Sequence, residues 1–188
     1  MVWLKRTSLF ISVFLLAAAL SYWFWLPSAE VRESESYAAM SAFLSSGLTG
    51  ESHSLGSSHR LVVIYGVTSN GMFRLLPTNW SGFSSWPMRA DATIRTLFPA
   101  RMEHKFNLPT QYIFSKDPSR TESDLTEEQQ RAGYGMITFS KVIFNHDATR
   151  AVFYTEHLCG LCGEGDFVAM EKRNGRWVVV NARSTWVS

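Results

Sequence analysis

The last third of the sequence constrains the fold most strongly, because four short segments there have the composition of β-strands. These segments are residues 136–144, 151–157, 166–172 and 177–186. They are rich in β-branched and aromatic residues, and turn residues such as Asn174 and Gly175 lie between them. Strands that are joined by such short connections pair as antiparallel neighbours. This part of the chain therefore predicts a four-strand antiparallel meander.

A helix is predicted before this sheet, over residues 30–48. Its apolar residues recur at steps of three and four, which places them on one helix face. They are Val31, Tyr37, Met40, Phe43, Leu44 and Leu48. A helix packed on a curved antiparallel sheet is an α+β domain, with cystatin-like and nuclear-transport-factor-2-like folds as analogues. Such an architecture does not by itself indicate a function.

Further elements are predicted between the helix and the meander. The continuous apolar run at residues 61–65 is typical of a strand buried on both faces, and residues 111–115 predict another strand. Asp91 is a candidate N-cap for a short helix that ends at Pro99. Another short helix is expected between residues 119 and 133, where two capping-box patterns occur.

The N-terminal part of the chain predicts a membrane anchor. Residues 7–28 carry no charge, and Lys5 and Arg6 precede them. A helix of about 20 apolar residues spans a hydrocarbon core of roughly 30 Å, and positive charges on its short leading side keep that end in the cytoplasm. An aromatic cluster follows where such a helix would meet the outer interface. It consists of Tyr22, Trp23, Phe24 and Trp25.

This organisation predicts a domain that works outside the cytoplasm. Residues 1–28 form a signal anchor or a signal peptide, and residues 29–188 form one extracytoplasmic α+β domain, which is periplasmic in a Gram-negative cell. An uncleaved anchor makes the lipid bilayer a partner through residues 7–28 and the protein a single-pass cell-membrane protein. Cleavage after the alanines at 17–19 would instead give a secreted protein, but would leave the aromatic cluster on the mature end.

Composition excludes two classes of protein. Hydrophobic residues make up 46% of the chain, with 7 Trp, 6 Tyr and 13 Phe, so the chain can bury a core and is not expected to be disordered. The net charge of +2 is accounted for by Lys5 and Arg6, and the rest of the chain has equal numbers of basic and acidic residues. Because no surplus or cluster of basic residues remains, no nucleic-acid partner is expected.

The segment at residues 156–166 is the one constellation that could carry chemistry, because it contains both cysteines of the chain. The leading hypothesis is a disulfide between Cys159 and Cys162, since paired thiols outside the cytoplasm tend to be oxidised. Such a bond would clamp a glycine-rich hairpin. The positive φ angles of its tight turn would be supplied by Gly160, Gly163 and Gly165.

Two other hypotheses use the same cysteines. A redox site is one, because Cys-x-x-Cys is the motif of thioredoxin-like enzymes, although here a strand rather than a helix is predicted after it. A site for zinc or copper is the other, with His157, Cys159 and Cys162 as ligands. Its fourth ligand would be Glu156, Glu164 or Asp166. Without that metal, no cofactor is expected.

Other signals in the sequence are weaker. The chain lacks the Gly-x-Ser-x-Gly, phosphate-loop and His-Glu-x-x-His motifs. Three aromatic residues, Trp80, Phe83 and Trp86, lie in a region of Ser, Asn and Gly and are interpreted as core anchors or as the lip of an apolar pocket.

The C-terminal 55 or so residues resemble a family of uncharacterised exported or membrane-anchored bacterial proteins. The resemblance rests on Gly135-Met-Ile-Thr-Phe-Ser140, on the hairpin Cys159-Gly-Leu-Cys162-Gly163, on Asn174-Gly175-Arg176-Trp177 and on the closing Trp186-Val187-Ser188. A Cys-Gly-x-Cys-Gly hairpin marks this family, and the resemblance implies no catalytic residue.

The leading interpretation of function is therefore a membrane-tethered domain without enzymatic activity, which binds a protein partner or a small ligand. An envelope thiol–disulfide or metal-binding protein centred on Cys159 and Cys162 is the first alternative. A small hydrolase or isomerase that uses a pocket in the sheet is the second.

Overall fold

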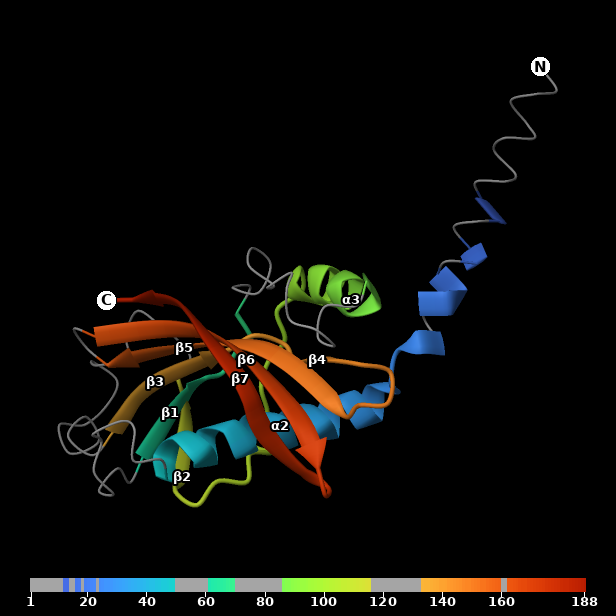
Figure 1. Cartoon of the computed structure of the whole chain (residues 1–188). Helices are drawn as coiled ribbons and strands as arrows, with labels where there is room; N and C mark the ends of the chain where they lie inside the picture. Colours follow the sequence, from blue (N-terminus) through green and yellow to red (C-terminus); the bar gives the residue numbers. More distant parts are fainter. Residues whose placement is uncertain are drawn as a thin grey trace.

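The computed structural model describes residues 12–13, 16–17, 19–22, 24–49, 61–69, 86–115, 133–159 and 162–188. Two helices and seven strands carry labels in this part of the chain (Figure 1). The helices are α2 (Ala29–Thr49) and α3 (Trp86–Thr96). The strands are β1 (Leu61–Tyr65), β2 (Gln111–Ser115), β3 (Gly133–Phe139), β4 (Ile143–Phe144), β5 (Arg150–Cys159), β6 (Cys162–Arg173) and β7 (Arg176–Val187). The helix expected between residues 119 and 133 lies outside the described residues.

One mixed sheet dominates the fold. Its strand order is β2-β1-β3-β5-β6-β7, and β4 pairs with β5. β1 lies parallel to both β2 and β3, whereas β3, β5, β6 and β7 pair as antiparallel neighbours. The predicted fold class is therefore wrong: the domain is a sheet-dominated structure with a parallel part, and not a helix packed on an antiparallel sheet behind a membrane helix.

The strand β1 explains why that prediction failed. Val62 and Ile64 point into the main core, and Leu61 and Val63 belong to a second buried cluster with Met136. β1 is thus buried on both faces, as its continuous apolar sequence predicted, and such a run is typical of a parallel strand. The sequence did not indicate which strands lie beside it, because strand pairing depends on segments far apart in the chain.

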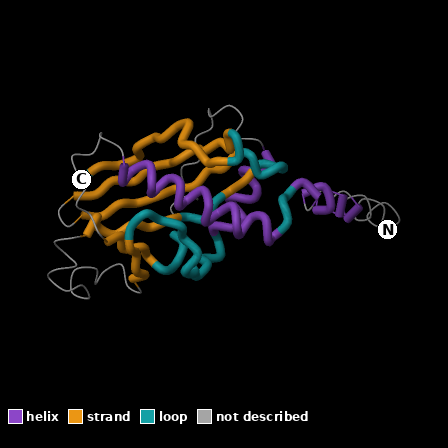
Figure 2. Tube along the Cα trace, turned by 90° about the horizontal axis from the view of Figure 1, so that it is seen from below, coloured by secondary structure: helices purple, strands orange, loops and turns teal. Residues whose placement is uncertain are grey.

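The helix α2 lies across one face of the sheet (Figures 1 and 2). Ser28 caps its start, since the backbone N of Val31 donates to the Ser28 hydroxyl oxygen over 3.3 Å. The side chain of Phe43 packs edge-on against Phe139 and Phe153, with ring centroids 6.4 and 5.6 Å apart. These contacts hold α2 on the sheet by burying aromatic area.

The structure does not support a membrane anchor. Within the described residues no helix is both long enough and apolar enough to cross a membrane. The long helix α2 carries four charged residues in its first two turns, which are Glu30, Arg32, Glu33 and Glu35. The predicted single-pass anchor at residues 7–28 and the location deduced from it are therefore corrected, whereas the bilayer as a partner stays a prediction. Residues 7–11, 14, 15, 18 and 23 of that run lie outside the described residues.

The aromatic cluster that was expected at a membrane interface instead contacts the domain. The Tyr22 hydroxyl donates to Oδ1 of Asp91 over 2.9 Å. The backbone oxygen of Trp25 lies 2.7 Å from Nδ1 of His146, and the two rings are 6.3 Å apart. Phe24 is 76% exposed, and Trp23 lies outside the described residues. Of the three aromatic residues of this cluster that the structure describes, Tyr22 and Trp25 therefore make intramolecular contacts.

Candidate functional site

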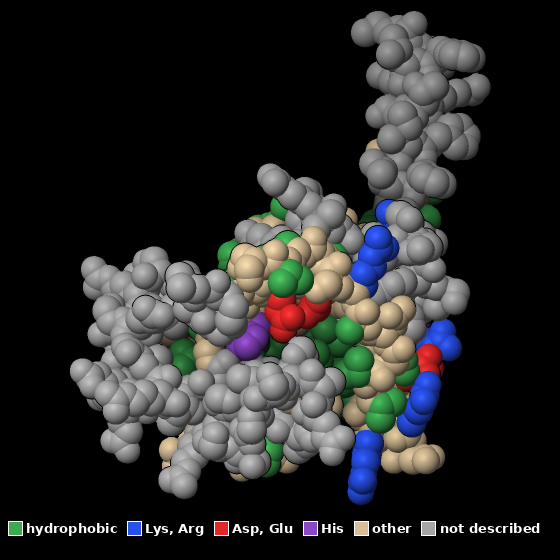
Figure 3. All heavy atoms as spheres, turned by 60° about the vertical axis from the view of Figure 1, so that its left-hand side comes forward, with side chains coloured by type: hydrophobic (Ala, Val, Ile, Leu, Met, Phe, Trp, Pro, Cys, Tyr) green, Lys and Arg blue, Asp and Glu red, His purple; other side chains and the backbone are tan. Residues whose placement is uncertain are grey.

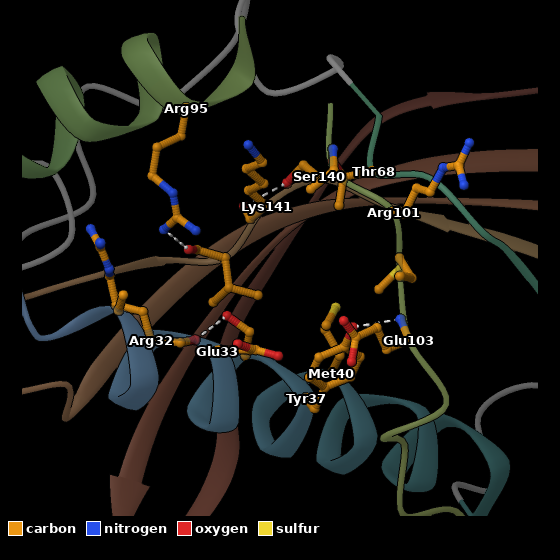
Figure 4. Close-up of a pocket in the computed structure, with 15 residues that line it drawn as sticks. Arg32, Glu33, Tyr37, Met40, Thr68, Arg95, Arg101, Glu103, Ser140 and Lys141 are labelled. Carbon is orange, nitrogen blue, oxygen red and sulfur yellow. Dashed lines mark hydrogen bonds between the residues drawn. The ribbon is translucent and has the colours of Figure 1, made fainter. Parts of the chain in front are cut away.

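A cavity of about 320 Å³ opens between the N-terminal half of α2, the C-terminal end of α3 and the residues that follow β3. Figure 4 shows α3 above this cavity and α2 below it. Six charged side chains line the cavity, and four of them are basic. They are Arg32, Glu33, Arg95, Arg101, Glu103 and Lys141.

Three of the basic side chains gather on one side of the cavity. Arg95 points down from α3, and Arg32 rises from α2 on the same side (Figure 4). Nη1 of Arg95 donates to the backbone oxygen of Val142 over 2.9 Å. Nζ of Lys141 donates to the backbone oxygen of Phe98. The head group of Arg101 points away from the other three in Figure 4, so it contributes to the rim rather than to this cluster.

The pKa values of two of these groups show that the cations influence one another. Burial lowers the pKa of Lys141, and the nearby positive charge of Arg95 lowers it further. Burial also lowers the pKa of Arg95, the charge of Asp91 opposes this shift, and Arg32 adds to it. The cations are thus close enough to repel one another in a partly desolvated site, and a bound anion would relieve that repulsion.

The two acidic residues that line the cavity are already paired. Lys105 binds the carboxylates of both Glu33 and Glu103, and its Nζ lies 2.8 Å from Oε2 of Glu103. Hydrogen bonds, first to Glu103 and then to Glu33, raise the pKa of Lys105. One ammonium group offsets one of the two carboxylate charges, so one net negative charge remains at this side of the cavity against the four basic side chains of its wall.

The rest of the wall is apolar or committed to the backbone. Tyr37, Met40, Met102 and Val142 provide apolar area. The hydroxyl oxygen of Tyr37 accepts from the backbone N of Glu103 over 2.7 Å, and that of Thr68 accepts from the backbone N of Ala100 over 2.9 Å. These bonds tie residues 100–103 to α2 and to the segment that follows β1, and so fix the shape of the cavity.

The cysteine hairpin lies at another end of the sheet. The register of β5 and β6 places Cys159 opposite Cys162 and His157 opposite Glu164. Nδ1 of His157 is 3.7 Å from Oε1 of Glu164. No disulfide is seen in the described part of the chain, and the side chains of both cysteines lie outside it, so the predicted disulfide clamp is not supported.

The glycines of this hairpin do not act as predicted. Gly163 and Gly165 have no positive φ, and Gly160 lies outside the described residues. Both described glycines instead leave room for Trp186. A Cβ on Gly163 would come within 2.9 Å of the indole ring, and a Cβ on Gly165 would overlap the indole nitrogen and the Tyr154 hydroxyl. Close packing, rather than turn geometry, requires glycine here.

The hypothesis of a metal site stays a prediction. Among the described residues no three His, Cys, Asp or Glu side chains lie together as a metal would require. Of the fourth ligands considered, Glu164 lies opposite His157, whereas Asp166 lies opposite Thr155 and Glu156 lies opposite Gly165. Because successive side chains of a strand point to opposite faces, Glu156 lies on the other face from His157.

The sequence did not reveal the cavity. Trp80 and Phe83, which were considered as the lip of a pocket, lie outside the described residues, and of Trp86 only the backbone is described, in α3. The basic side chains come instead from α2, α3 and the end of β3, separated by tens of residues. No motif links them, and their only sequence signal is that each lies close to apolar residues.

Comparison with protein-family models, with curated proteins and with solved structures gave no match to this chain. The resemblance of the C-terminal segment to exported bacterial proteins therefore stays a prediction. What the molecule does must be inferred from the cavity itself.

Proposed function

We propose that this domain binds a small anion, a carboxylate or a phosphate, in the cavity between α2 and α3. The observation that carries the proposal is the cluster of Arg32, Arg95 and Lys141 on one side of a partly buried cavity. Guanidinium groups bind carboxylate and phosphate through paired hydrogen bonds, and an ammonium group adds a point charge.

The charge balance of the cavity supports this proposal. Asp91 lies 3.5 Å from Arg95 and offsets its charge, while Glu33 and Glu103 are paired with Lys105. Within the described residues, neither Arg32 nor Lys141 forms an ion pair with a carboxylate. Lys105 offsets only one of the two carboxylate charges that it binds, so the three positive charges of Arg32, Arg101 and Lys141 face one remaining negative charge. The cavity therefore has about two positive charges in excess, which suits a ligand with one or two negative charges.

A small anion is favoured over a polyanion. The cavity has a volume of about 320 Å³, at the lower end of ligand sites in proteins. On the face drawn in Figure 3, the described basic side chains lie apart from one another along one margin, with acidic side chains among them. A polyanion needs a continuous basic surface, and that face does not present one among its described side chains.

Binding is favoured over catalysis by the way the wall is built. The Ser140 hydroxyl accepts from the backbone N of Tyr154 and donates to the backbone oxygen of Lys141, over 2.8 and 3.1 Å. The hydroxyl thus holds the chain at the end of β3 in place. The described side chains of the wall supply charge and shape, whereas acid–base catalysis would need a proton donor and acceptor facing each other.

Calorimetric titration of the full chain with sodium acetate and with sodium phosphate, at constant ionic strength, tests the proposal. We expect saturable binding of one anion per chain. Arg32→Gln and Lys141→Met should each weaken it about tenfold, since each removes a hydrogen bond to a charged group. Arg176→Gln, which makes the same charge change at an exposed site away from the cavity, should leave the affinity unchanged. Absence of saturable binding, or an equal loss in Arg176→Gln, would contradict the proposal.

A further inference from the structure

We propose that the ligand is an amphiphilic carboxylate, whose head group binds the basic cluster and whose short unbranched aliphatic tail lies against Tyr37, Met40 and Met102. This inference rests on the proposed function and specifies the chemical class of the anion. It follows from the composition of the two ends of the cavity, from the state of its hydroxyl groups and from its length.

The larger apolar side chains of the wall lie away from Arg32, Arg95 and Lys141, beside the ion pairs of Lys105 with Glu33 and Glu103 at the mouth of the cavity. Figure 4 shows Tyr37 and Met40 beside each other on α2, below the level of Arg95 and Lys141. Tyr37 packs edge-on against Phe106, with ring centroids 5.2 Å apart, and its hydroxyl is bound to the backbone N of Glu103. Tyr37 lines the cavity, so its ring adds apolar area there, with Nζ of Lys105 6.0 Å from the ring centroid. Methionine side chains are unbranched and adaptable, and they pack well against a flexible chain.

The hydroxyl groups of the wall are engaged with the protein. Ser36 donates to the backbone oxygen of Arg32 over 2.5 Å. Thr68 accepts from the backbone N of Ala100, and Ser140 both accepts and donates, as described above. A ligand with many hydroxyl groups would find few partners here, and would leave some of its own polar groups unpaired. An aliphatic tail has no such requirement.

The cavity is longer than an inorganic anion requires. Arg32 and Met40 both line it and are eight residues apart on α2, so they are about 12 Å apart along the helix axis. An inorganic oxyanion is only a few water molecules in size, and each water occupies about 30 Å³ of the liquid. Such an ion would leave most of the roughly 320 Å³ to water against apolar side chains. A chain of several methylenes would displace that water.

A series of carboxylates tests the inference in the full chain. Acetate, butyrate and hexanoate share one head group and differ only in tail length, and gluconate has six carbons with a hydroxylated chain. Each methylene that enters the cavity should tighten binding about fourfold, so hexanoate should bind at least about tenfold more tightly than acetate. Gluconate should bind no more tightly than acetate. Equal affinities across the aliphatic series, or tighter binding of gluconate than of hexanoate, would overturn the inference.

Two variants of one wall residue sharpen this test. Met102→Gln places an amide against the tail and should reduce the gain per methylene to less than about twofold, whereas Met102→Leu keeps an apolar side chain and should retain the gain. An equal gain per methylene in Met102→Gln and in the unmodified chain would place the tail elsewhere and overturn the inference. If acetate and phosphate bind but the length of the tail does not change the affinity, the ligand is not an amphiphilic carboxylate, and the proposed anion site is retained. If no anion binds, the proposed function itself fails.

Discussion

The guanidinium of Arg95 lies 3.5 Å from the carboxylate of Asp91, a side chain that is only 1% exposed. The other carboxylate oxygen of Asp91 accepts from the Tyr22 hydroxyl over 2.9 Å. In the described part of the chain, Oδ2 of Asp91 has this ion pair but no aligned hydrogen bond. Asp91 thus depends on Arg95 for compensation of its buried charge, and Arg95 is in turn held over the cavity.

Arg95→Leu should lower the free energy of unfolding by about 3 kcal/mol, because it leaves the Asp91 charge buried without compensation. Denaturation by urea measures this effect. The double variant Asp91→Asn with Arg95→Leu should be more stable than Arg95→Leu alone, since it removes the buried charge as well. If the double variant loses as much free energy of unfolding as Asp91→Asn and Arg95→Leu lose together, the two residues are not coupled energetically.

Lys105→Met should weaken acetate binding about two- to fivefold, because Glu33 and Glu103 would then oppose the anion at the mouth of the cavity. Calorimetry at low ionic strength measures the loss. The effect should shrink at high salt, because these side chains are about half exposed and their charges are screened. Lys105→Arg keeps the charge and should bind acetate as the unmodified chain does. Equal weakening in both variants would point to a loss of local structure instead.

The pH dependence of stability should report on Lys141. Its pKa is lowered below the ordinary value of 10.5, so between the lowered value and 10.5 the folded chain binds fewer protons than the unfolded chain. Stability relative to Lys141→Met should therefore rise as the pH increases through this interval. Acetate affinity should fall over the same interval, because the neutral amine no longer attracts the anion. Urea denaturation and acetate titration of both proteins measure the two trends. A relative stability that falls as the pH increases, or an acetate affinity that rises, would contradict the assignment.

Gly165→Ala should lower the free energy of unfolding by about 3 kcal/mol, because the added methyl group would overlap Trp186 and Tyr154 in a tightly packed region. The hydrogen bond of 2.8 Å from Nε1 of Trp186 to the Tyr154 hydroxyl would have to break or move. Thermal and urea denaturation measure the loss. Gly175→Asn is the matched control, since Gly175 has a φ of 76° that Asn tolerates and no atom within 4 Å of an added Cβ. A larger loss in the control would mean that backbone conformation, not packing, is what these glycines provide.

Local sequence patterns located most of the described elements. The helix predicted at residues 30–48 occurs as Ala29–Thr49, and the strands predicted at 61–65 and 111–115 occur with those bounds. The helix expected from Asp91 to Pro99 instead runs from Trp86 to Thr96, because Pro87 occupies its first turn, where proline is favoured. Periodicity and turn residues act over a few residues, so they could be evaluated from the sequence.

Features that depend on distant segments could not be predicted. The parallel pairing of β1 with β2 and β3 joins segments about 50 and 70 residues apart, and no local pattern specifies those partners. The apolar run before α2 predicted a bilayer, because Tyr22 and Trp25 have the same sequence signature whether they meet lipid or protein. The cavity was missed for the same reason, since Arg32, Arg95 and Lys141 come together only through the fold.

Methionine methyl NMR during a titration with sodium acetate, at constant ionic strength, tests the anion site most directly. Met40 and Met102 line the cavity, whereas Met136 and Met170 are buried elsewhere in the core. We predict that the methyl resonances of Met40 and Met102 shift along one saturable curve while those of Met136 and Met170 stay in place. Linear shifts of equal size in all four resonances, or no shift in any of them, would contradict an anion site between α2 and α3.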